Sequence, residues 1–262
     1  MTRTILIAAL IAATEPHAVT YGESLLDSAH VRRPALVAVQ MEVADGKGHP
    51  VTITRAWHGR GRSRDKQTLS DANGNQIGTV TIATRCANPT RSAEIASEIS
   101  RRIYSSASLN EPAPFVAGAA LAPYAQTLVD DAIDRDPQLV TLAFHVTAPF
   151  AETNSIVASS FGRIGKLADA DDQRVMLAGA TLRELTNAGK RLAIELPLLD
   201  ARGRTVGALS TSFRVDPNAD LESIAKRAVA LRDWLASKIP SLKALFRPAT
   251  ASRQVRALDD CL

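Results

Sequence analysis

The chain contains an internal duplication. Residues 21–60 align with residues 124–163 without a gap, at an offset of 103, and twelve of these forty positions are identical. The identical pairs are Tyr21/Tyr124, Leu25/Leu128, Asp27/Asp130, Ala29/Ala132, Arg32/Arg135, Pro34/Pro137, Leu36/Leu139, Val37/Val140, Val43/Val146, Ile53/Ile156, Gly59/Gly162 and Arg60/Arg163. A repeat of this length predicts two copies of one folding unit, joined end to end.

A second block aligns at an offset of 129. It pairs Asp71-Ala72-x-Gly74 with Asp200-Ala201-x-Gly203, Gly78 with Gly207, Arg85 with Arg214, and Ile95-Ala96 with Ile224-Ala225. Since 129 − 103 = 26, the second copy carries 26 extra residues between its Gly-Arg pair and its Asp-Ala-x-Gly turn. We call the stretch that holds them, residues 164–190, the variable segment.

Each copy predicts the same series of elements. The series is an amphipathic helix ended by proline (21–33; 124–136), a strand (36–43; 139–146), a second strand (51–55; 155–160), a strand pair (191–199 and 205–215, clearest in copy two) and a closing helix (91–106; 221–239). Asp-Ala-x-Gly predicts the hairpin turn between the paired strands, because glycine tolerates positive φ. The fold class is therefore α+β, with two tandem units whose antiparallel sheets are each covered by helix.

The first residues predict export. Met1-Thr2-Arg3 is positively charged, Thr4–Ala13 is apolar, and Glu15-Pro16-His17 breaks the run, which is the layout of a secretory signal peptide. The alternative is a buried N-terminal helix or strand. The predicted organisation is a signal peptide (1–18), a reduced unit (19–107), a linker (108–122), a complete unit (123–246) and a tail (247–262). We therefore expect a periplasmic or secreted protein without an integral membrane segment after processing.

Composition limits the partners. The net charge is +4, aromatic residues make up 4% of the chain, and the basic run Arg60–Lys66 lies near a single aromatic residue, Trp57. A nucleic-acid surface is therefore not predicted. The spacing of Cys86 and Cys261 excludes a local metal cluster or redox pair. They form one disulfide in an oxidising compartment or remain two unpaired small hydrophobes.

One stretch of the second copy resembles a known family. The motifs NSIVASSFGRIGK and IELPLLDARGRTVGALSTSF (residues 154–166 and 194–213), with a short acidic helix between them, are similar to the extracytoplasmic PAS-like sensor domains called Cache or PDC domains. The resemblance covers residues 124–215 well and residues 21–85 in reduced form. It implies a long N-terminal helix against a curved antiparallel sheet that binds a small molecule. The residue spacing that clamps amino-acid ligands in the best-characterised branch is absent, so no ligand is carried over.

The candidate ligand residues all lie in the second unit. Arg163 and Lys166, in a glycine-flanked loop, have the side chains that bind carboxylates or phosphates. Ser159 and Ser160 precede this loop, and His145 lies on the opposite strand face from Phe144. The structural alternatives are an Arg163 that holds Asp171, Asp172 or loop carbonyls, and a His145 that is solvated or hydrogen-bonded. Asp169, Asp171 and Asp172 predict the start of a helix rather than a calcium loop.

The functional prediction is an exported, sensor-type binding protein for a small molecule, with an anion favoured and the pocket in the second unit. The alternative is an envelope interaction or scaffold protein whose PAS-like units form a homodimer or bind an envelope partner. Ser159 and Ser160 lack the flanking glycines of a nucleophile elbow, and Ser223-x-x-Lys226 has no companion motif. We therefore predict no catalytic residue, no cofactor, no metal site and no enzymatic activity.

Overall fold

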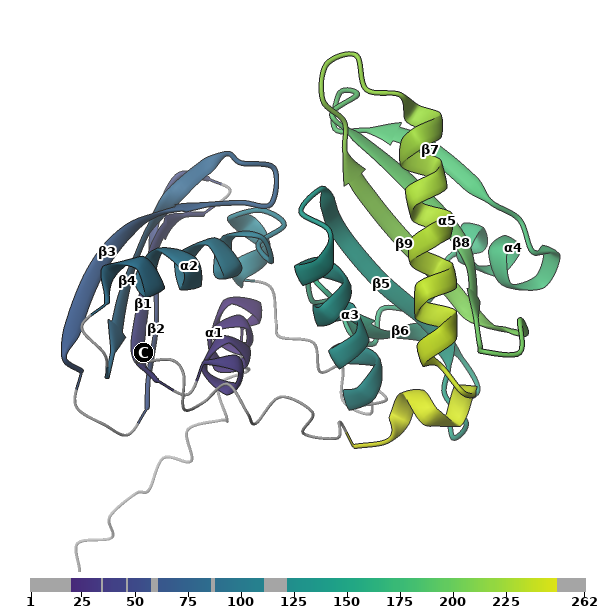
Figure 1. The fold of residues 1–262 in the computed structure, drawn as a ribbon, viewed down its shortest axis with the longest axis horizontal. Coiled ribbons are helices and arrows are strands. Elements are labelled where there is room, and N and C mark those ends of the chain that lie inside the picture. The colour runs from purple at the N-terminus through teal and green to yellow at the C-terminus, as the bar shows by residue number, and fades with distance from the viewer. Residues whose placement is uncertain are drawn as a thin grey trace, which may run out of the picture.

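The computed structural model describes residues 20–33, 35–45, 47–57, 61–85, 88–110 and 122–248. Figure 1 shows two antiparallel sheets on opposite sides of the molecule, each accompanied by helices. This arrangement confirms the predicted α+β class and the two units in tandem.

The first unit has a four-stranded sheet in the order β2-β1-β4-β3. Its elements are α1 (Tyr21–Arg32), β1 (Leu36–Ala44), β2 (Pro50–Ala56), β3 (Ser63–Ser70), β4 (Gln76–Thr84), α2 (Pro89–Ser100) and the 3-10 helix η1 (Ala107–Asn110). Thr20 and Glu23 form a capping box that starts α1. Asn88 caps α2 and Pro89 follows it, a position that does not need the missing N–H.

The second unit has a five-stranded sheet in the order β6-β5-β9-β8-β7. Its elements are α3 (Pro123–Arg135), β5 (Leu139–Thr147), β6 (Asn154–Ser159), α4 (Ala170–Ala178), β7 (Leu182–Thr186), β8 (Arg191–Leu199), β9 (Thr205–Arg214), α5 (Leu221–Lys238) and the 3-10 helix η2 (Leu242–Phe246). The two sheets match strand for strand once β7 is removed. The extra residues of the second copy therefore form α4 and β7.

The paired hairpins close with the same hydrogen bonds in both copies. The carboxylate Oδ1 of Asp71 accepts from two backbone amides of its turn, at 2.8 and 3.0 Å. Asp200 does the same at 2.9 and 3.1 Å. Gly74 and Gly203 have φ values of 83° and 75° and donate back to these aspartates. The repeated Asp-Ala-x-Gly motif is therefore a turn motif, as its sequence predicts.

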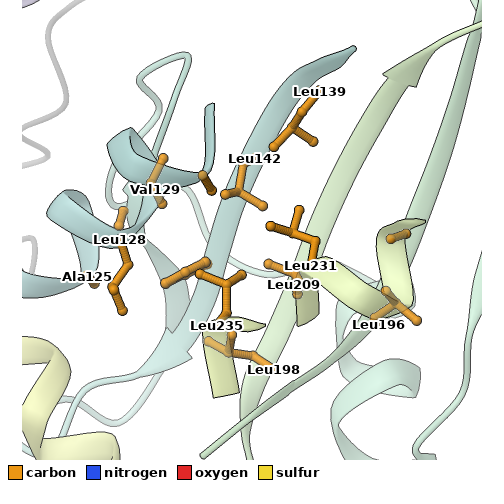
Figure 2. Close-up of a cluster of buried hydrophobic side chains, with 14 of the residues drawn as sticks. Ala125, Leu128, Val129, Leu139, Leu142, Leu196, Leu198, Leu209, Leu231 and Leu235 are labelled. Atoms are coloured by element: carbon orange, nitrogen blue, oxygen red, sulfur yellow. The ribbon is translucent and has the colours of Figure 1, made fainter. Parts of the chain in front are cut away.

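The core of the second unit lies between its sheet and the helices α3 and α5 (Figure 2). Alternate residues of a strand share one face, and most of those facing these helices are apolar. The side chains labelled in Figure 2 are Ala125, Leu128 and Val129 of α3, Leu139 and Leu142 of β5, Leu196 and Leu198 of β8, Leu209 of β9, and Leu231 and Leu235 of α5. A separate core packs the first sheet against α1 and α2.

The two units contact each other through buried polar groups. Arg102 follows α2 of the first unit, and its side chain is 3% exposed. Its Nη2 donates to Oδ1 of Asp134 on α3 at 2.9 Å, and Asp130 lies one helical turn away, 3.8 Å from Nε. Burial lowers the pKa of Arg102, but Asp130, Asp134 and Glu98 raise it by more, so its pKa stays above the usual value. The arginine is therefore a charged link between the units.

The structure corrects two of the predicted elements. The closing helix of the first unit, predicted over 91–106, ends at Ser100, and the turn that follows it carries Arg102, which bonds to Asp134 of the second unit. The variable segment contains the predicted acidic helix and also the edge strand β7, which was not predicted. The signal peptide, Cys86, Cys261, the Gly59-Arg60 pair, residues 111–121 of the predicted linker and residues 249–262 of the predicted tail lie outside the described residues.

Candidate functional site

The second sheet has a polar face that is covered by α4. Alternation along β5, β8 and β9 places His145, Glu195 and Ser210 on the face opposite the apolar core. Glu195 lies directly across from Ser210 in the β8–β9 pair. In the first unit, Glu42 occupies the position of His145, is exposed and pairs with Lys66. The covering helix therefore turns an ordinary polar sheet surface into a buried polar layer.

Asp172 attaches α4 to this layer. Asp169 and Asp172 form the capping box of the helix, with the Asp172 carboxylate accepting from the Asp169 amide at 3.0 Å. The same oxygen lies 2.9 Å from Nδ1 of His145, and the two side chains are 2% and 7% exposed. Nδ1 has no aligned hydrogen-bond partner among the described residues, so the contact is a close electrostatic one. The Ser210 hydroxyl donates to the other carboxylate oxygen at 3.4 Å.

These contacts shift the pKa values of two carboxyl groups in opposite directions. Burial raises the pKa of Asp172, but His145, the Asp169 amide and Ser210 lower it by more, so the net shift is downward. Burial and the negative charges of Asp172, Asp169 and Asp171 raise the pKa of Glu195 to about 7. One oxygen of Glu195, Oε2, is buried without a hydrogen-bond partner among the described residues. Glu195 is therefore a half-buried acid that titrates near neutral pH.

An open groove lies at the end of this layer. Its volume is about 590 Å³, and it is lined by Thr147, Pro149, Asn154, Met176, Arg204, Thr205, Val206, Gly207, Ser241, Leu242 and Lys243. Thr147 lies two residues beyond His145 on β5, and Met176 lies four residues beyond Asp172 on α4. Each pair shares one face of its element. The groove therefore borders the His145–Asp172 contact.

Two charged side chains of the described residues line the groove, and both are cations. Arg204 donates to the buried carboxylate of Asp200 at 2.6 and 2.8 Å, which offsets part of its charge. Lys243 is exposed. Asn154 lies on the groove wall and donates to the sulfur of Met176 at 3.0 Å, while its buried Oδ1 has no hydrogen-bond partner among the described residues. An unpaired buried acceptor of this kind favours a ligand or water that donates to it.

The predicted ligand residues lie in three different settings. The Ser160 hydroxyl accepts from the Leu142 amide at 3.0 Å, and the Ser159 hydroxyl accepts from the Phe161 amide at 3.1 Å. Both serines are buried at the end of β6. His145 is buried under α4. Arg163 and Lys166 are exposed in the loop that follows β6, with the Arg163 guanidinium 5.8 Å from the centroid of the Phe161 ring. None of the five lines the groove.

Sequence reasoning missed several of the polar residues found here. Asp172 was interpreted as part of a helix start, which is correct, but its contact with His145 spans 27 residues of chain and leaves no local pattern. Glu195 did leave a signal, because it is the one charged residue in the apolar run Leu192–Leu199. Lys243 follows the proline that ends the last helix, in a stretch without periodicity. No pattern in the sequence marks it.

The described part of the chain has no cluster of metal-ligating side chains and no membrane-spanning helix. No three His, Cys, Asp or Glu side chains there lie close enough together to hold a metal ion. None of the helices in those residues has the length and apolar character needed to cross a bilayer.

Comparisons with known proteins identify no family. No family model and no curated protein matches the chain. Among solved structures, the chain is similar to a double mutant of the inducer-binding domain of the transcription factor PobR from Acinetobacter, in complex with 3-hydroxybenzoic acid. The identity is 17% over 47% of this chain and 99% of that chain, with a TM-score of 0.29. It is also similar to PelD from Pseudomonas aeruginosa, at 12% identity over 90% of this chain and 83% of that chain, with a TM-score of 0.27. At these TM-scores, neither likeness assigns a fold or a function.

Proposed function

We propose that this chain is an exported sensor-type protein that binds a small anionic molecule in the groove of its second unit. The observation that carries the proposal is the groove itself. Its volume of about 590 Å³ falls within the range of small-molecule sites, roughly 300–1,000 Å³. Among the described residues, its charged lining residues are Arg204 and Lys243, and none of them is acidic. Membership of the Cache-like sensor family remains part of this proposal.

The lining supports an anion with an apolar body. Lys243 supplies a point charge for a carboxylate or phosphate, and the hydroxyls of Thr147, Thr205 and Ser241 supply further donors. Met176 and Leu242 supply apolar surface for the body of the ligand. The unpaired Oδ1 of Asn154 would accept a hydrogen bond from a ligand hydroxyl. In this proposal, α4 forms one wall of the site, and the first unit, which has no counterpart of α4 among its described residues, has no such wall.

A titration with matched variants tests the proposal. Isothermal titration and thermal shift would be measured with benzoate, acetate and inorganic phosphate, with benzamide as the uncharged analogue of benzoate. We expect at least one anion to raise the melting temperature and Lys243→Ala to abolish that shift. Lys226→Ala, an exposed lysine on α5 outside the groove, should leave it unchanged. An unchanged shift in Lys243→Ala, or no shift with any anion, would contradict the proposal.

Export has its own test. We expect fractionation of bacterial cells that express the full chain with a C-terminal tag to recover the protein in the periplasm or medium, shortened at its N-terminus. A full-length cytoplasmic product would contradict export and leave the binding proposal to the titration.

A further inference from the structure

A tyrosine of the first unit contacts the second unit at the end of β6 that lies opposite the groove. Tyr21 is the first residue of α1 and is buried. Its hydroxyl oxygen lies 2.6 Å from the carbonyl oxygen of Ser160 in the second unit and 2.7 Å from that of Arg102 in the first. A phenol has one hydrogen, so the hydroxyl donates to one carbonyl at a time. When it donates to Ser160, Tyr21 connects the first residue of α1 to the residue that follows β6.

Three consecutive residues of the second unit, Ser160 to Gly162, contact aromatic residues of the first unit. The Ser160 carbonyl contacts the Tyr21 hydroxyl. The centroid of the Phe161 ring lies 5.8 Å from the centroid of the Tyr104 ring. The Tyr21 ring packs against Gly162, where an added Cβ would lie 3.0 Å from Cδ2 of the tyrosine. Gly162 also has a φ of 82°, which few other residues adopt. The backbone conformation therefore favours glycine, and the tyrosine ring would hold an added Cβ in tight contact.

The same stretch of chain continues directly into the wall of the groove. Ile164 packs with Ala143 and Ile156 on the polar side of the sheet. The Ile156 amide donates to the Lys166 carbonyl at 2.9 Å, and the Ala168 amide donates to the Asn154 carbonyl at 3.0 Å. Asn154 lines the groove, and α4 begins at Ala170. The segment from Gly162 to Ala168 therefore runs from the Tyr21 ring to the groove in seven residues.

We propose that Tyr21 is a positioning residue for the ligand site of the second unit. By holding Ser160 and Gly162, it fixes one end of the segment that carries α4, while the contact of Asp172 with His145 fixes the other. The first unit then has a role that its own sheet does not reveal, because it keeps the groove wall in place. The importance of this role for binding rests on the proposed function. The positioning itself does not depend on any ligand.

The duplication supplies a matched control. Tyr124 is the copy-two equivalent of Tyr21 and is the second residue of α3. Its hydroxyl donates to the Lys238 carbonyl at the end of α5, at 2.7 Å, within the second unit. Tyr21→Phe and Tyr124→Phe each remove one hydroxyl at equivalent positions. Only the first removes a contact with the segment that leads to α4.

Hydrogen exchange of the full chain, measured by mass spectrometry without ligand, tests the inference. Tyr21→Phe should speed exchange across 161–178 by roughly five- to tenfold, the effect of losing one net hydrogen bond. Exchange in the β8–β9 strands, 191–214, should not change. Tyr124→Phe should leave 161–178 at the wild-type rate. Gly162→Ala, which pushes against the tyrosine ring, should speed exchange of the same peptides.

Two results would overturn it: wild-type exchange over 161–178 in Tyr21→Phe, or an increase spread evenly over the whole chain, which would indicate a general loss of stability. Benzoate titration of the same variants separates this inference from the proposed function. If wild type binds benzoate, Tyr21→Phe should weaken binding severalfold and Tyr124→Phe should not. If no variant binds any anion, the proposed function fails, and the exchange data alone decide the role of Tyr21.

Discussion

Nδ1 of His145 lies 2.9 Å from the Asp172 carboxylate, and both side chains are almost completely buried between the second sheet and α4. Among the residues of α4, only Asp172 and Val175 are buried, so this contact accounts for much of what holds the helix on the sheet. It also borders the groove. The first prediction therefore concerns its removal.

Asp172→Ala should lower the free energy of unfolding by roughly 3 kcal/mol, because it leaves a buried imidazole without its carboxylate and removes half of a capping box. Asp171→Ala is the control. Asp171 is the preceding residue, and its exposed pair with Arg174 should contribute about 0.5 kcal/mol or less. Chemical denaturation of both variants gives the comparison. Equal losses would show that the His145 contact adds nothing to an ordinary helix start.

Glu195 should make stability depend on pH between about 5 and 8. Its pKa is about 7 in the folded protein and near 4.5 in the unfolded chain, so the folded state holds a proton that unfolding releases in this range. The contribution of Glu195 to the free energy of unfolding is therefore fully present below pH 4.5 and is lost as the pH rises through about 7. Relative to Glu195→Gln, wild type should lose roughly 1 kcal/mol from pH 5 to pH 8, after allowance for a half-exposed group. The measurement is chemical denaturation of both proteins across this pH range. If their free energies of unfolding change in parallel with pH, Glu195 does not cause the dependence.

Arg102→Ala should be among the most destabilising single changes in the chain. It leaves Asp130 and Asp134 without their buried cation, at a cost of about 3–5 kcal/mol. The neighbouring Arg101, 35% exposed and 3.5 Å from the same Asp134, is the control, and Arg101→Ala should cost about 1 kcal/mol or less. A double-mutant cycle with Asp134→Ala should show coupling for Arg102. Additive losses would mean that the two units are held together by other contacts.

Two nearby glycines should respond differently to alanine. A Cβ at Gly207 would lie 2.3 Å from the His145 carbonyl oxygen on the facing strand, so Gly207→Ala should cost about 3 kcal/mol. Gly203 has open space around it and a φ of 75°, so Gly203→Ala should cost only the conformational penalty, about 1 kcal/mol. Thermal denaturation ranks the pair. The reverse order would show that the strands separate more easily than their spacing implies.

Much of this fold could be predicted from local patterns. The bounds of β8, Arg191–Leu199, agree with the prediction because an apolar strand ends at an Asp-Ala-x-Gly turn. Asp220 caps α5 through the Glu222 amide, as expected of an N-cap aspartate. The repeat then extends these assignments to the weaker first copy. Strand β7 escaped prediction because it is an edge strand with three exposed residues, Arg183–Leu185, and lacks alternation.

The candidate site was predicted less well, for a physical reason. Its contacts join residues far apart in the chain, such as His145 to Asp172 and Tyr21 to Ser160. Sequence periodicity reflects only neighbours within one helix or strand, so it cannot predict such pairs. The sequence did indicate that the candidate ligand site belongs to the second unit, which alone has the long variable segment, and α4 lies in that segment. The local pattern that places Arg163 and Lys166 in a glycine-flanked loop gave no indication of the cations at the groove, Arg204 and Lys243.

The buried arginine between the units bears on how this protein can be dissected. A fragment that starts at residue 122 would keep Asp130 and Asp134 and lose Arg102, so two carboxylates one turn apart on α3 would face solvent without their counter-charge. Such a fragment should be less stable than the second half of the intact chain, and a weak or absent ligand signal from it would say little about the full-length protein. Replacing both aspartates with asparagine before cutting would remove this artefact.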